Sequence, residues 1–427
     1  ILSKSSKFES IARTYRFRIL GEACRDSNVR SLLLAHHEDD HYETILMRLA
    51  VGHRGRGPLG MKPNVQIPEC YGIYGVYDSG LGATDNTEAA SNERRLGSPQ
   101  LGHMHHEDGG IRVLRPLLQY SKDRLVATCL QSDSSWFEDH TNADPALTLR
   151  NTIRHIYKQH SLPTALQKDR IVPLSSALQQ KKNGQEMDAL AFLDHCITRD
   201  FQPRSGSLAV RFPKLTSLEI NPANGKEQTN SWQTQREVAC RLLKYAIETV
   251  SPYEHTQYPL DRVCKYVFPE LSSANDQEKA CPGRFTAAGV MFEMSELNLS
   301  QDEKAPYEAE TDHQEPQQHS PSFPMQDCEW LLSRQPYPSM LGRRPLLEYP
   351  PQVVFRDSND GWQFYDGRYW IRIVNHTQSI IKVRPLHKKD LAAFKRVKYI
   401  SQRLKTIARG DLRFTLPVIV MGAAGPG

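Results

Sequence analysis

A short apolar run, followed at once by a polar cluster and then by a helical pattern, constrains the fold of this chain more than any other feature. The run SLLLA at residues 31–35 has the composition of a buried strand covered on both faces. The segment at 42–50 places Ile45 and Leu49 on one face of a helix, and another helical pattern covers residues 8–25. This order of helix, strand, turn and helix predicts an α/β fold, in which ligands bind at the carboxyl ends of the strands.

The polar cluster between the strand and the helix, residues 36–41, has two interpretations. His37 and His41 fit the zinc-protease motif H-E-x-x-H, but its extended form needs Gly and His where this chain has Thr44 and Met47. At the carboxyl end of a strand, histidines and carboxylates can instead orient a nucleotide, bind Mg²⁺ or accept a proton. We therefore favour nucleotide chemistry and keep a zinc metalloprotease as an alternative.

The two neighbouring aspartates of this cluster also have a structural interpretation. Aspartate is favoured at helix N-caps and in first turns, so we expect either Asp39 or Asp40 to cap the following helix. Six consecutive polar residues after a buried strand are more than capping requires. A functional role for the cluster is therefore predicted beside the structural one.

Changes in composition along the chain indicate four parts. The first is a parallel-sheet α/β domain over 1–165, interrupted by an insertion over 63–110 that is rich in Pro, Gly, Asn and Ser and is expected at the surface. A mostly helical region over 181–294 and an acidic, flexible linker over 295–325 follow. The last part is a small, basic α+β domain over 345–427.

The last part carries the strongest charge asymmetry of the chain. A hairpin is predicted over 362–374 with Asp-Gly at its turn, and a basic helix over 390–408. Between Lys382 and Arg413 there are eleven Lys and Arg residues against two acids, and aromatic residues lie among them. Such a strip predicts contacts with nucleic-acid phosphates. The candidate tRNA-binding residues are Lys388, Lys389, Lys395, Arg396, Lys398, Arg403, Lys405 and Arg413.

Two compositional features narrow the function classes. The eight cysteines are scattered without a C-x-x-C pair, which favours reduced thiols over a disulfide framework or a zinc ribbon. No run of 18 apolar residues is present, so no transmembrane span and no membrane partner are expected.

Four ordered sequence blocks are spread over residues 8–157, outside the insertion. They read FESIARTYRF, LLLAHHEDDHYETILMRLAVG, LRPLL and EDHTNADPALTLRNTIRHIY, and the segment RFTLPVIV follows at 413–420. The second block is similar to the A-H-H-x-D-D-Q-x-E-T segment of the tRNA(Ile)-lysidine synthase family. The other blocks resemble that family's E-x-x-A-R-x-x-R, R-P-L, D-x-x-N…R-N-x-I-R and closing R-x-T-L-P elements.

This resemblance implies an N-type ATP pyrophosphatase fold and an enzyme that depends on ATP and Mg²⁺. Such an enzyme activates the wobble cytidine of an isoleucine tRNA, and the side-chain amine of free lysine then displaces AMP to give lysidine. The implied catalytic residues are His36, Asp40, Glu43 and Arg16, with Asp40 assisting proton removal or holding Mg²⁺. The implied substrate- and ATP-binding residues are Arg115, Asp139, Asn142, Arg150, Asn151 and Arg154.

The chain departs from the family pattern in two places. His41 replaces the usual Gln, and the family's pyrophosphatase loop S-G-G-x-D-S does not occur in the 427 residues. That loop would present backbone N–H groups to the ATP phosphates. We expect it upstream of Ile1, so that the domain as given lacks its first strand and loop and hydrolyses ATP poorly.

Other interpretations remain open at this point. The first is a non-catalytic tRNA-binding relative, which lacks the loop altogether. A tRNA thiolase of the same class would show paired or catalytic cysteines near the site, and none is evident in the sequence. The long insertion and the Gln- and Pro-rich linker favour a mitochondrial protein, with a cytoplasmic one as the alternative. Homodimer formation is left open.

Overall fold

The chain divides into two compact units. The computed structural model describes residues 2–53, 57–77, 109–138, 144–215, 232–254, 259–271, 282–296, 325–337, 344–355 and 359–421. Unit 1 comprises residues 1–83 and 106–184, and unit 2 comprises residues 84–105 and 185–427. Among the described helices, none is both long enough and apolar enough to cross a bilayer.

Unit 1 combines helices with a small sheet, in the order that the sequence predicted. Its helices are α1 (Leu2–Asp26), α2 (Glu38–Ala50), α3 (Lys122–Gln131), α4 (Leu149–Gln159) and the first part of α5 (Lys168–Asp194). Its strands are β1 (Ser31–Leu33), β2 (Asn64–Gln66) and β3 (Arg112–Leu114). The predicted α1, β1 and α2 are thus confirmed, with bounds shifted by a few residues.

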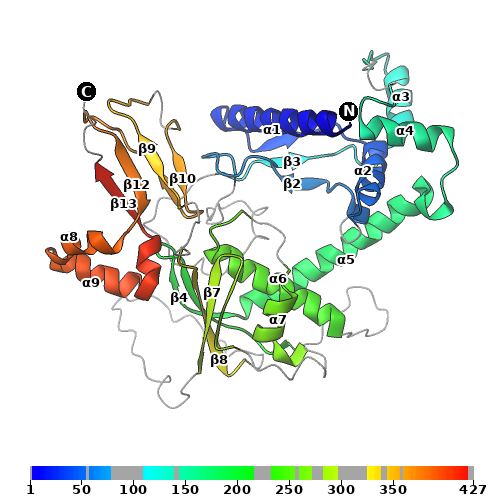
Figure 1. Cartoon of the computed structure of the whole chain (residues 1–427). Helices are drawn as coiled ribbons and strands as arrows, with labels where there is room; N and C mark the ends of the chain where they lie inside the picture. Colours follow the sequence, from blue (N-terminus) through cyan, green and yellow to red (C-terminus); the bar gives the residue numbers. More distant parts are fainter. Residues whose placement is uncertain are drawn as a thin grey trace, which may run out of the picture. The chain divides into compact units, whose positions relative to one another are not determined.

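The sheet of unit 1 has the strand order β1-β3-β2. β1 and β3 are parallel, with Leu33 opposite Leu114, whereas β2 is antiparallel to β3. Figure 1 shows α1 lying along this sheet, and the buried side chains of Phe17, Ile67 and Val113 pack together there. The described sheet is therefore mixed instead of purely parallel.

Two predictions about unit 1 need correction. β1 was expected to be covered on both faces, but it ends the strand order and the side chain of Leu33 is 65% exposed. The segment after residue 63 was expected to be a surface insertion, yet β2 pairs with β3, and Ile67, Cys70 and Val76 are buried. Pro and Gly in this segment form turns between buried positions, so composition alone was misleading. Residues 78–108 lie outside the described part.

Unit 2 begins with an antiparallel sheet. Its strand order is β4-β5-β8-β7-β6, and the strands are β4 (Ile197–Gln202), β5 (Ser207–Arg211), β6 (Arg284–Ala287), β7 (Val290–Glu296) and β8 (Cys328–Arg334). Helices α6 (Trp232–Val250) and α7 (Asp261–Val267) pack against it around a core that includes Leu242, Phe292 and Trp330. The predicted helix within 236–250 is confirmed.

The prediction of a mostly helical region over 181–294 is correct only in part. Four strands, β4 to β7, lie in this range beside the end of α5, α6 and α7. The sequence did not predict these strands, because a strand of four to seven residues with mixed polarity leaves a weak period-2 pattern. The predicted linker over 295–325 lies almost entirely outside the described residues.

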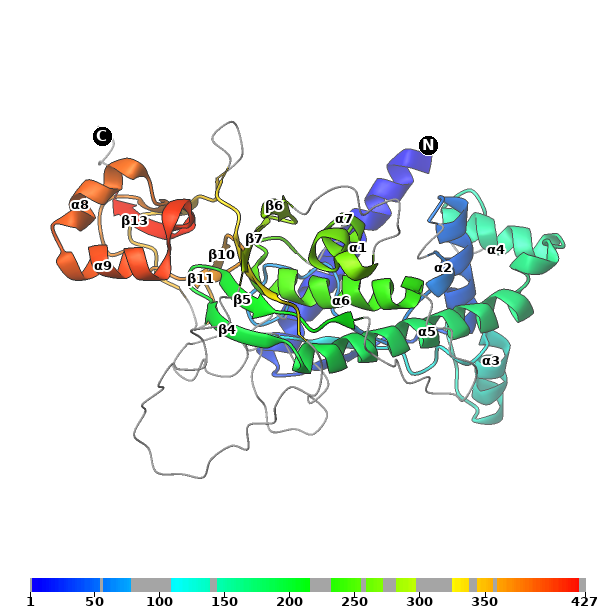
Figure 2. The same cartoon turned by 90° about the horizontal axis from the view of Figure 1, so that it is seen from below.

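The C-terminal part of unit 2 contains a second antiparallel sheet, a hairpin and two short helices. The sheet has the order β13-β12-β9, with β9 (Leu347–Tyr349), β12 (Ile381–Pro385) and β13 (Pro417–Met421). The hairpin consists of β10 (Gln363–Tyr365) and β11 (Tyr369–Ile371). Figures 1 and 2 show the helices α8 (Leu391–Lys395) and α9 (Lys398–Ile407) side by side. The single basic helix predicted over 390–408 is therefore two helices.

Candidate functional site

The polar groups of the first sequence block lie at one edge of the sheet in unit 1. β1 leads through Leu34 and Ala35 into His36, and β3 leads directly into Arg115. Because the two strands are parallel, their carboxyl ends meet at the same edge, where the Leu34 N–H donates to the Leu114 carbonyl at 2.9 Å. The fold thus brings two segments that are about 80 residues apart to one place.

The first turn of α2 is held by a capping box. The N-cap is His37, whose Nδ1 accepts from the Asp40 N–H at 3.4 Å, while Asp40 Oδ2 accepts from the His37 N–H at 3.1 Å. The expectation that Asp39 or Asp40 caps the helix is therefore met by Asp40 at the third helical position. Asp40 Oδ1 takes no part in the cap and faces Arg150 Nη1 at 3.6 Å.

Asp39 has a structural role that ties α2 to two other helices. Its carboxylate accepts from the Lys122 N–H at the start of α3 at 2.7 Å and from Lys168 Nζ of α5 at 2.7 Å. Burial opposes ionisation of Asp39, but the hydrogen bonds from Lys168 and Lys122 outweigh it and lower its pKa. Lys168 also pairs with Glu38 at 2.7 Å, and nothing in the sequence blocks pointed to it.

His36 lies half-buried beside several guanidinium groups. Burial lowers the pKa of its imidazole, against the opposing charge of Asp40. The charges of Arg13, Arg115 and Arg150 lower this pKa further, so the ring is neutral at neutral pH. Its Nδ1 is buried without a hydrogen-bond partner in the described structure. A neutral imidazole among cations is suited to receive an anion.

Arg115 and Arg150 each leave a hydrogen-bond donor without an acceptor among the described residues. Arg115 is 8% exposed and donates from Nη1 to the Lys62 carbonyl at 2.8 Å, but its Nε makes no hydrogen bond within the described residues. Arg150 Nε is likewise buried without a hydrogen bond there, and its nearest ion-pair distances, to Asp40 and Glu43, are 3.6 and 3.8 Å. Both groups keep hydrogen-bonding capacity for a ligand.

Glu43 is engaged in the packing of α2 against α4. Its side chain is 1% exposed, and its carboxylate binds Arg154 through two hydrogen bonds of 2.7 and 3.0 Å. The Tyr157 hydroxyl donates to the same carboxylate at 3.1 Å. The Glu43 hydrogen bond raises the pKa of Arg154. A bidentate pair of this kind positions α4, which carries Arg150, and leaves Arg154 largely neutralised.

The remaining predicted site residues fall in different places. Arg16 is exposed on α1 and makes no hydrogen bond or ion pair with the residues described, whereas Arg13 on the same helix contributes to the field at His36. Asn151 is buried, and its side-chain amide donates to the Asp144 carbonyl at 2.9 Å, so it shapes the entry to α4. Asp139 and Asn142 lie outside the described residues.

The geometry around His41 opposes the zinc interpretation. Its Nδ1 accepts from the Met61 N–H at 3.0 Å, so its Nε2 carries the proton and donates to the Ser175 hydroxyl at 3.2 Å. Both ring nitrogens are therefore used within the protein, and His37 Nδ1 is used in the cap. No cluster of three His, Cys, Asp or Glu side chains fit for a metal occurs within the described ranges.

The predicted tRNA-binding residues lie on and around α8 and α9. All but Arg413 are exposed, and Arg413 donates from Nε to the Gly410 carbonyl at 2.7 Å. Arg403 stacks on Tyr399, with its guanidinium carbon 5.5 Å from the ring centre. The structure thus exposes seven of the eight cations in one stretch of unit 2.

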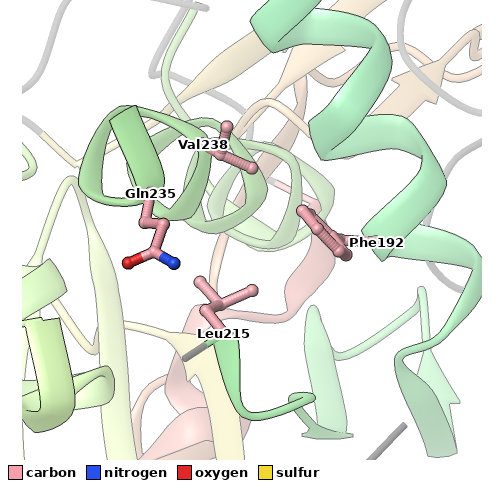
Figure 3. A pocket seen from close by; sticks show the side chains of 4 residues that line it. All are labelled: Phe192, Leu215, Gln235 and Val238. Carbon is pink, nitrogen blue, oxygen red and sulfur yellow. The ribbon is translucent and has the colours of Figure 1, made fainter. Parts of the chain in front are cut away.

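A small hollow in unit 2 holds none of the candidate residues. It has an empty volume of about 150 Å³ and is lined by Phe192, Leu215, Gln235 and Val238 (Figure 3). Gln235 is the only polar side chain of the four, and none of them can act as an acid, a base or a nucleophile. The hollow is therefore not a catalytic site.

Residues 2–160 match the family model described as a PP-loop domain. The α/β unit with polar groups at its strand edge is thus a PP-loop ATP-binding domain, and that domain lies within the chain. Only the loop and the first strand were expected upstream of Ile1, and the family match places the PP-loop domain itself within the chain from residue 2. The sequence S-G-G-x-D-S itself is absent from the 427 residues.

Beyond this domain, the chain is similar to tRNA(Ile)-lysidine synthases over most of its length. A probable tRNA(Ile)-lysidine synthase of Schizosaccharomyces pombe is 28% identical over 419 residues, which cover 97% of this chain and 71% of that relative. The tRNA(Ile)-lysidine synthase of Methylobacterium nodulans is 27% identical over 306 residues, or 71% of each protein. That of Lactiplantibacillus plantarum is 31% identical over 150 residues, 35% of this chain and 24% of the relative. The resemblance seen in the sequence blocks is confirmed as homology.

Proposed function

We propose that this protein ligates lysine to the wobble cytidine of an isoleucine tRNA in an ATP-dependent reaction, forming lysidine. The observation that carries the proposal is the strand edge of the PP-loop domain, where burial and the charges of Arg115, Arg150 and Arg13 lower the pKa of His36 against the charge of Asp40. Homology to tRNA(Ile)-lysidine synthases over most of the chain supports the choice of substrates.

The unsatisfied donors at this edge fit ATP. The buried Nε atoms of Arg115 and Arg150 have no hydrogen bond within the described residues, so a phosphate group would supply the missing acceptors. ATP provides the leaving group that lets an amine replace the exocyclic oxygen of the base. The positive charge around His36 would hold a polyanion such as ATP in place. It would repel cations, except for a cation that is bound to the phosphates.

Asp40 is the residue that we assign to Mg²⁺ or to the proton. Magnesium is commonly held by one or two carboxylates together with substrate phosphates, and Asp40 Oδ1 is available because the cap uses Oδ2. The same oxygen could accept the proton that the lysine amine loses as its bond to the base forms. Glu43 and Arg154 would contribute by positioning α4 against α2, because their charges are paired with each other.

Two alternatives are less well supported. A tRNA thiolase would need a reactive sulfur at the site, but Cys70 of unit 1 is buried, donates to the Phe17 carbonyl at 3.3 Å and has its pKa raised to about 11 by burial. A non-catalytic tRNA-binding relative would retain the basic surface without turnover. The reaction assay separates the second alternative from the proposal.

The test uses the complete product of the gene with ATP, Mg²⁺, labelled lysine and an isoleucine tRNA transcript that carries cytidine at the wobble position. We expect lysine to enter the tRNA, and Asp40→Asn to reduce the rate by roughly 100-fold or more. Asn keeps an oxygen that accepts from the His37 N–H, so the cap survives and the loss reports the carboxylate.

The matched control is Asp169→Asn, an exposed aspartate in the first turn of α5, which should leave incorporation unchanged. Full activity of Asp40→Asn would remove Asp40 from the chemistry. Tight tRNA binding without any incorporation by the unaltered protein would favour the non-catalytic relative. The mitochondrial location, also part of the proposal, is checked by imaging a C-terminal fluorescent fusion.

A further inference from the structure

Two neighbouring aromatic side chains project from the segment that follows α3. Phe137 is 99% exposed and Trp136 is 41% exposed. Single exposed apolar residues are common on protein surfaces, but a Phe with almost no protein contact beside an exposed Trp buries nothing and stabilises nothing by itself. Such a pair is suited to contact with a ligand.

An ion pair lies beside these two aromatic side chains. Lys122 Nζ lies 2.9 Å from a carboxylate oxygen of Glu138, the residue next to Phe137. A hydrogen bond from Lys122 is the main cause that lowers the pKa of Glu138, and the Trp136 indole and Lys158 contribute to the same effect. Lys122 and the Trp136 indole therefore act on the same carboxylate, and the charge of Lys158 also reaches it.

Tyr120 and Arg124 extend this surface. Tyr120 is 38% exposed, and the guanidinium carbon of Arg124 lies 5.0 Å from its ring centre. This arrangement holds a planar cation flat against an aromatic ring, where a nucleic acid base or phosphate can reach it. Exposed aromatic rings thus lie at both ends of the α3 segment, and Arg124 covers the first of them.

The surface is joined directly to the proposed reaction edge. The Glu38 N–H in the first turn of α2 donates to the Tyr120 carbonyl at 2.9 Å, and Asp39 accepts from the Lys122 N–H at 2.7 Å. Asp40, which we assign to the chemistry, is the next residue along α2. A base held at Trp136 and Phe137 would thus belong to the same nucleic acid segment as a base at Asp40.

We propose that Trp136 and Phe137 form a stacking surface for unpaired nucleotides of the RNA substrate, while Arg124 and Lys158 neutralise the adjoining phosphates. This inference rests on the proposed function and adds the residues that hold the loop beside the reacting base. Aromatic stacking tolerates any base and needs no deep pocket, which matches the open surface. The hydrogen bonds that join this surface to the first turn of α2 favour the RNA substrate over an apolar protein partner.

The test measures binding of a fluorescently labelled hairpin RNA with the anticodon stem and loop of an isoleucine tRNA, by anisotropy, to the full chain and to variants. Phe137→Leu and Trp136→Leu should each weaken hairpin binding roughly tenfold, because each removes one stacked base. Phe137→Trp and Trp136→Phe should retain affinity. A blunt duplex with the same stem should bind the Leu variants and the unaltered chain equally.

The control is Ile19→Ala, which removes another exposed apolar side chain, 62% exposed, from α1 and should change nothing. Because Phe137 makes almost no protein contact, its substitution leaves folding intact. Unchanged hairpin binding by both Leu variants, with lysine incorporation retained, overturns this inference alone. Failure of the unaltered chain to bind the hairpin overturns it together with the proposed function. If Phe137→Leu changes only the sedimentation of the protein, the surface is a protein contact instead.

Discussion

At the scale of single residues, the imidazole of His41 links three segments of unit 1. It belongs to α2, accepts from the Met61 N–H and donates to Ser175 of α5. Gly60 has φ +57° and faces the ring so closely that a Cβ there would overlap it. The side chain is 5% exposed, and burial together with Arg48 lowers its pKa. A neutral ring is therefore part of the folded state.

This geometry predicts the pH dependence of unit 1. The folded pKa of His41 lies below its ordinary value of 6.5, so the folded state resists protonation more than the unfolded state. The contribution to stability is complete above the ordinary value and is lost as the pH falls through the folded one. A Gln at this position can accept from Met61 and donate to Ser175 without titrating.

We therefore expect His41→Gln to lose less stability than the unaltered protein when the pH falls from neutral to mildly acidic. Urea unfolding at several pH values measures the difference. His53→Gln, at an exposed position just after α2, is the control and should follow the unaltered protein. Parallel curves for His41→Gln and the unaltered protein would contradict the expectation. His36 has a lowered pKa too, so some acid sensitivity remains in the variant.

At the scale of elements, the hairpin β10–β11 attaches the C-terminal sheet to the rest of unit 2. Its turn residues Asp366 and Gly367 have φ +51° and +64°, the positive values that a type I′ turn needs. The Asp366 carboxylate, 4% exposed, binds Arg334 of β8 at 2.9 Å and Arg368 at 2.6 Å. Arg368 also donates to the Ser205 and Thr415 carbonyls. The hairpin turn therefore forms a buried network of ion pairs and hydrogen bonds that joins β8 to the C-terminal part of unit 2.

Gly367 has a second constraint besides its φ angle. A Cβ there would overlap the backbone carbonyl of Pro252, whereas a Cβ at Gly410, φ +58°, would meet nothing within 4 Å. Gly410→Ala should cost about 1–2 kcal/mol from the backbone angle alone. Gly367→Ala should cost about 1–3 kcal/mol more, because the backbone of Pro252 cannot move aside easily.

The measurement is the free energy of unfolding in urea, followed by circular dichroism, for the two glycine variants and the unaltered chain. Equal losses for the two variants would mean that the hairpin turn does not pack against Pro252. Gly410→Ala serves as the matched control because its φ angle differs from that of Gly367 by only a few degrees.

At the scale of the whole molecule, the distribution of charge matters more than the net charge of +5. The exposed cations of α8 and α9 form no ion pair with an acidic side chain among the described residues, while Lys382 nearby pairs with Glu348 at 2.7 Å. Only cations that are not already neutralised release counterions from a bound polyanion. The unpaired lysines of α8 and α9 should therefore contribute more to the salt dependence of tRNA binding than the paired Lys382.

We expect Lys398→Ala combined with Lys405→Ala to lower the slope of log affinity for tRNA against log salt concentration by roughly 2. Lys382→Ala, the matched control, should lower it by much less because Glu348 already balances that charge. Filter binding at several salt concentrations gives both slopes. A slope that does not change in the double variant would exclude α9 as a phosphate contact.

The order of elements in unit 1, the hairpin turn and the basic C-terminal strip followed from the sequence. Periodicity, turn residues and charge density depend on neighbouring residues, so they can be read without the fold. The family blocks likewise placed His36, Asp40 and Arg115 at one site before any geometry was known. The short strands β4 to β7 were not predicted, because a strand of four to seven residues leaves only a weak period-2 pattern in the sequence.

The tertiary structure alone decided which charges meet. The charge of Arg13, not that of Arg16, lowers the pKa of His36. Glu43 is paired with Arg154, and Lys168 bonds Asp39 from another helix. The last two pairs join residues 111 and 129 positions apart. Their formation depends on how α2, α4 and α5 pack, and burial then sets which guanidinium groups are satisfied. Sequence separation of this size leaves no local signal, so only the fold distinguishes a structural ion pair from a free catalytic group.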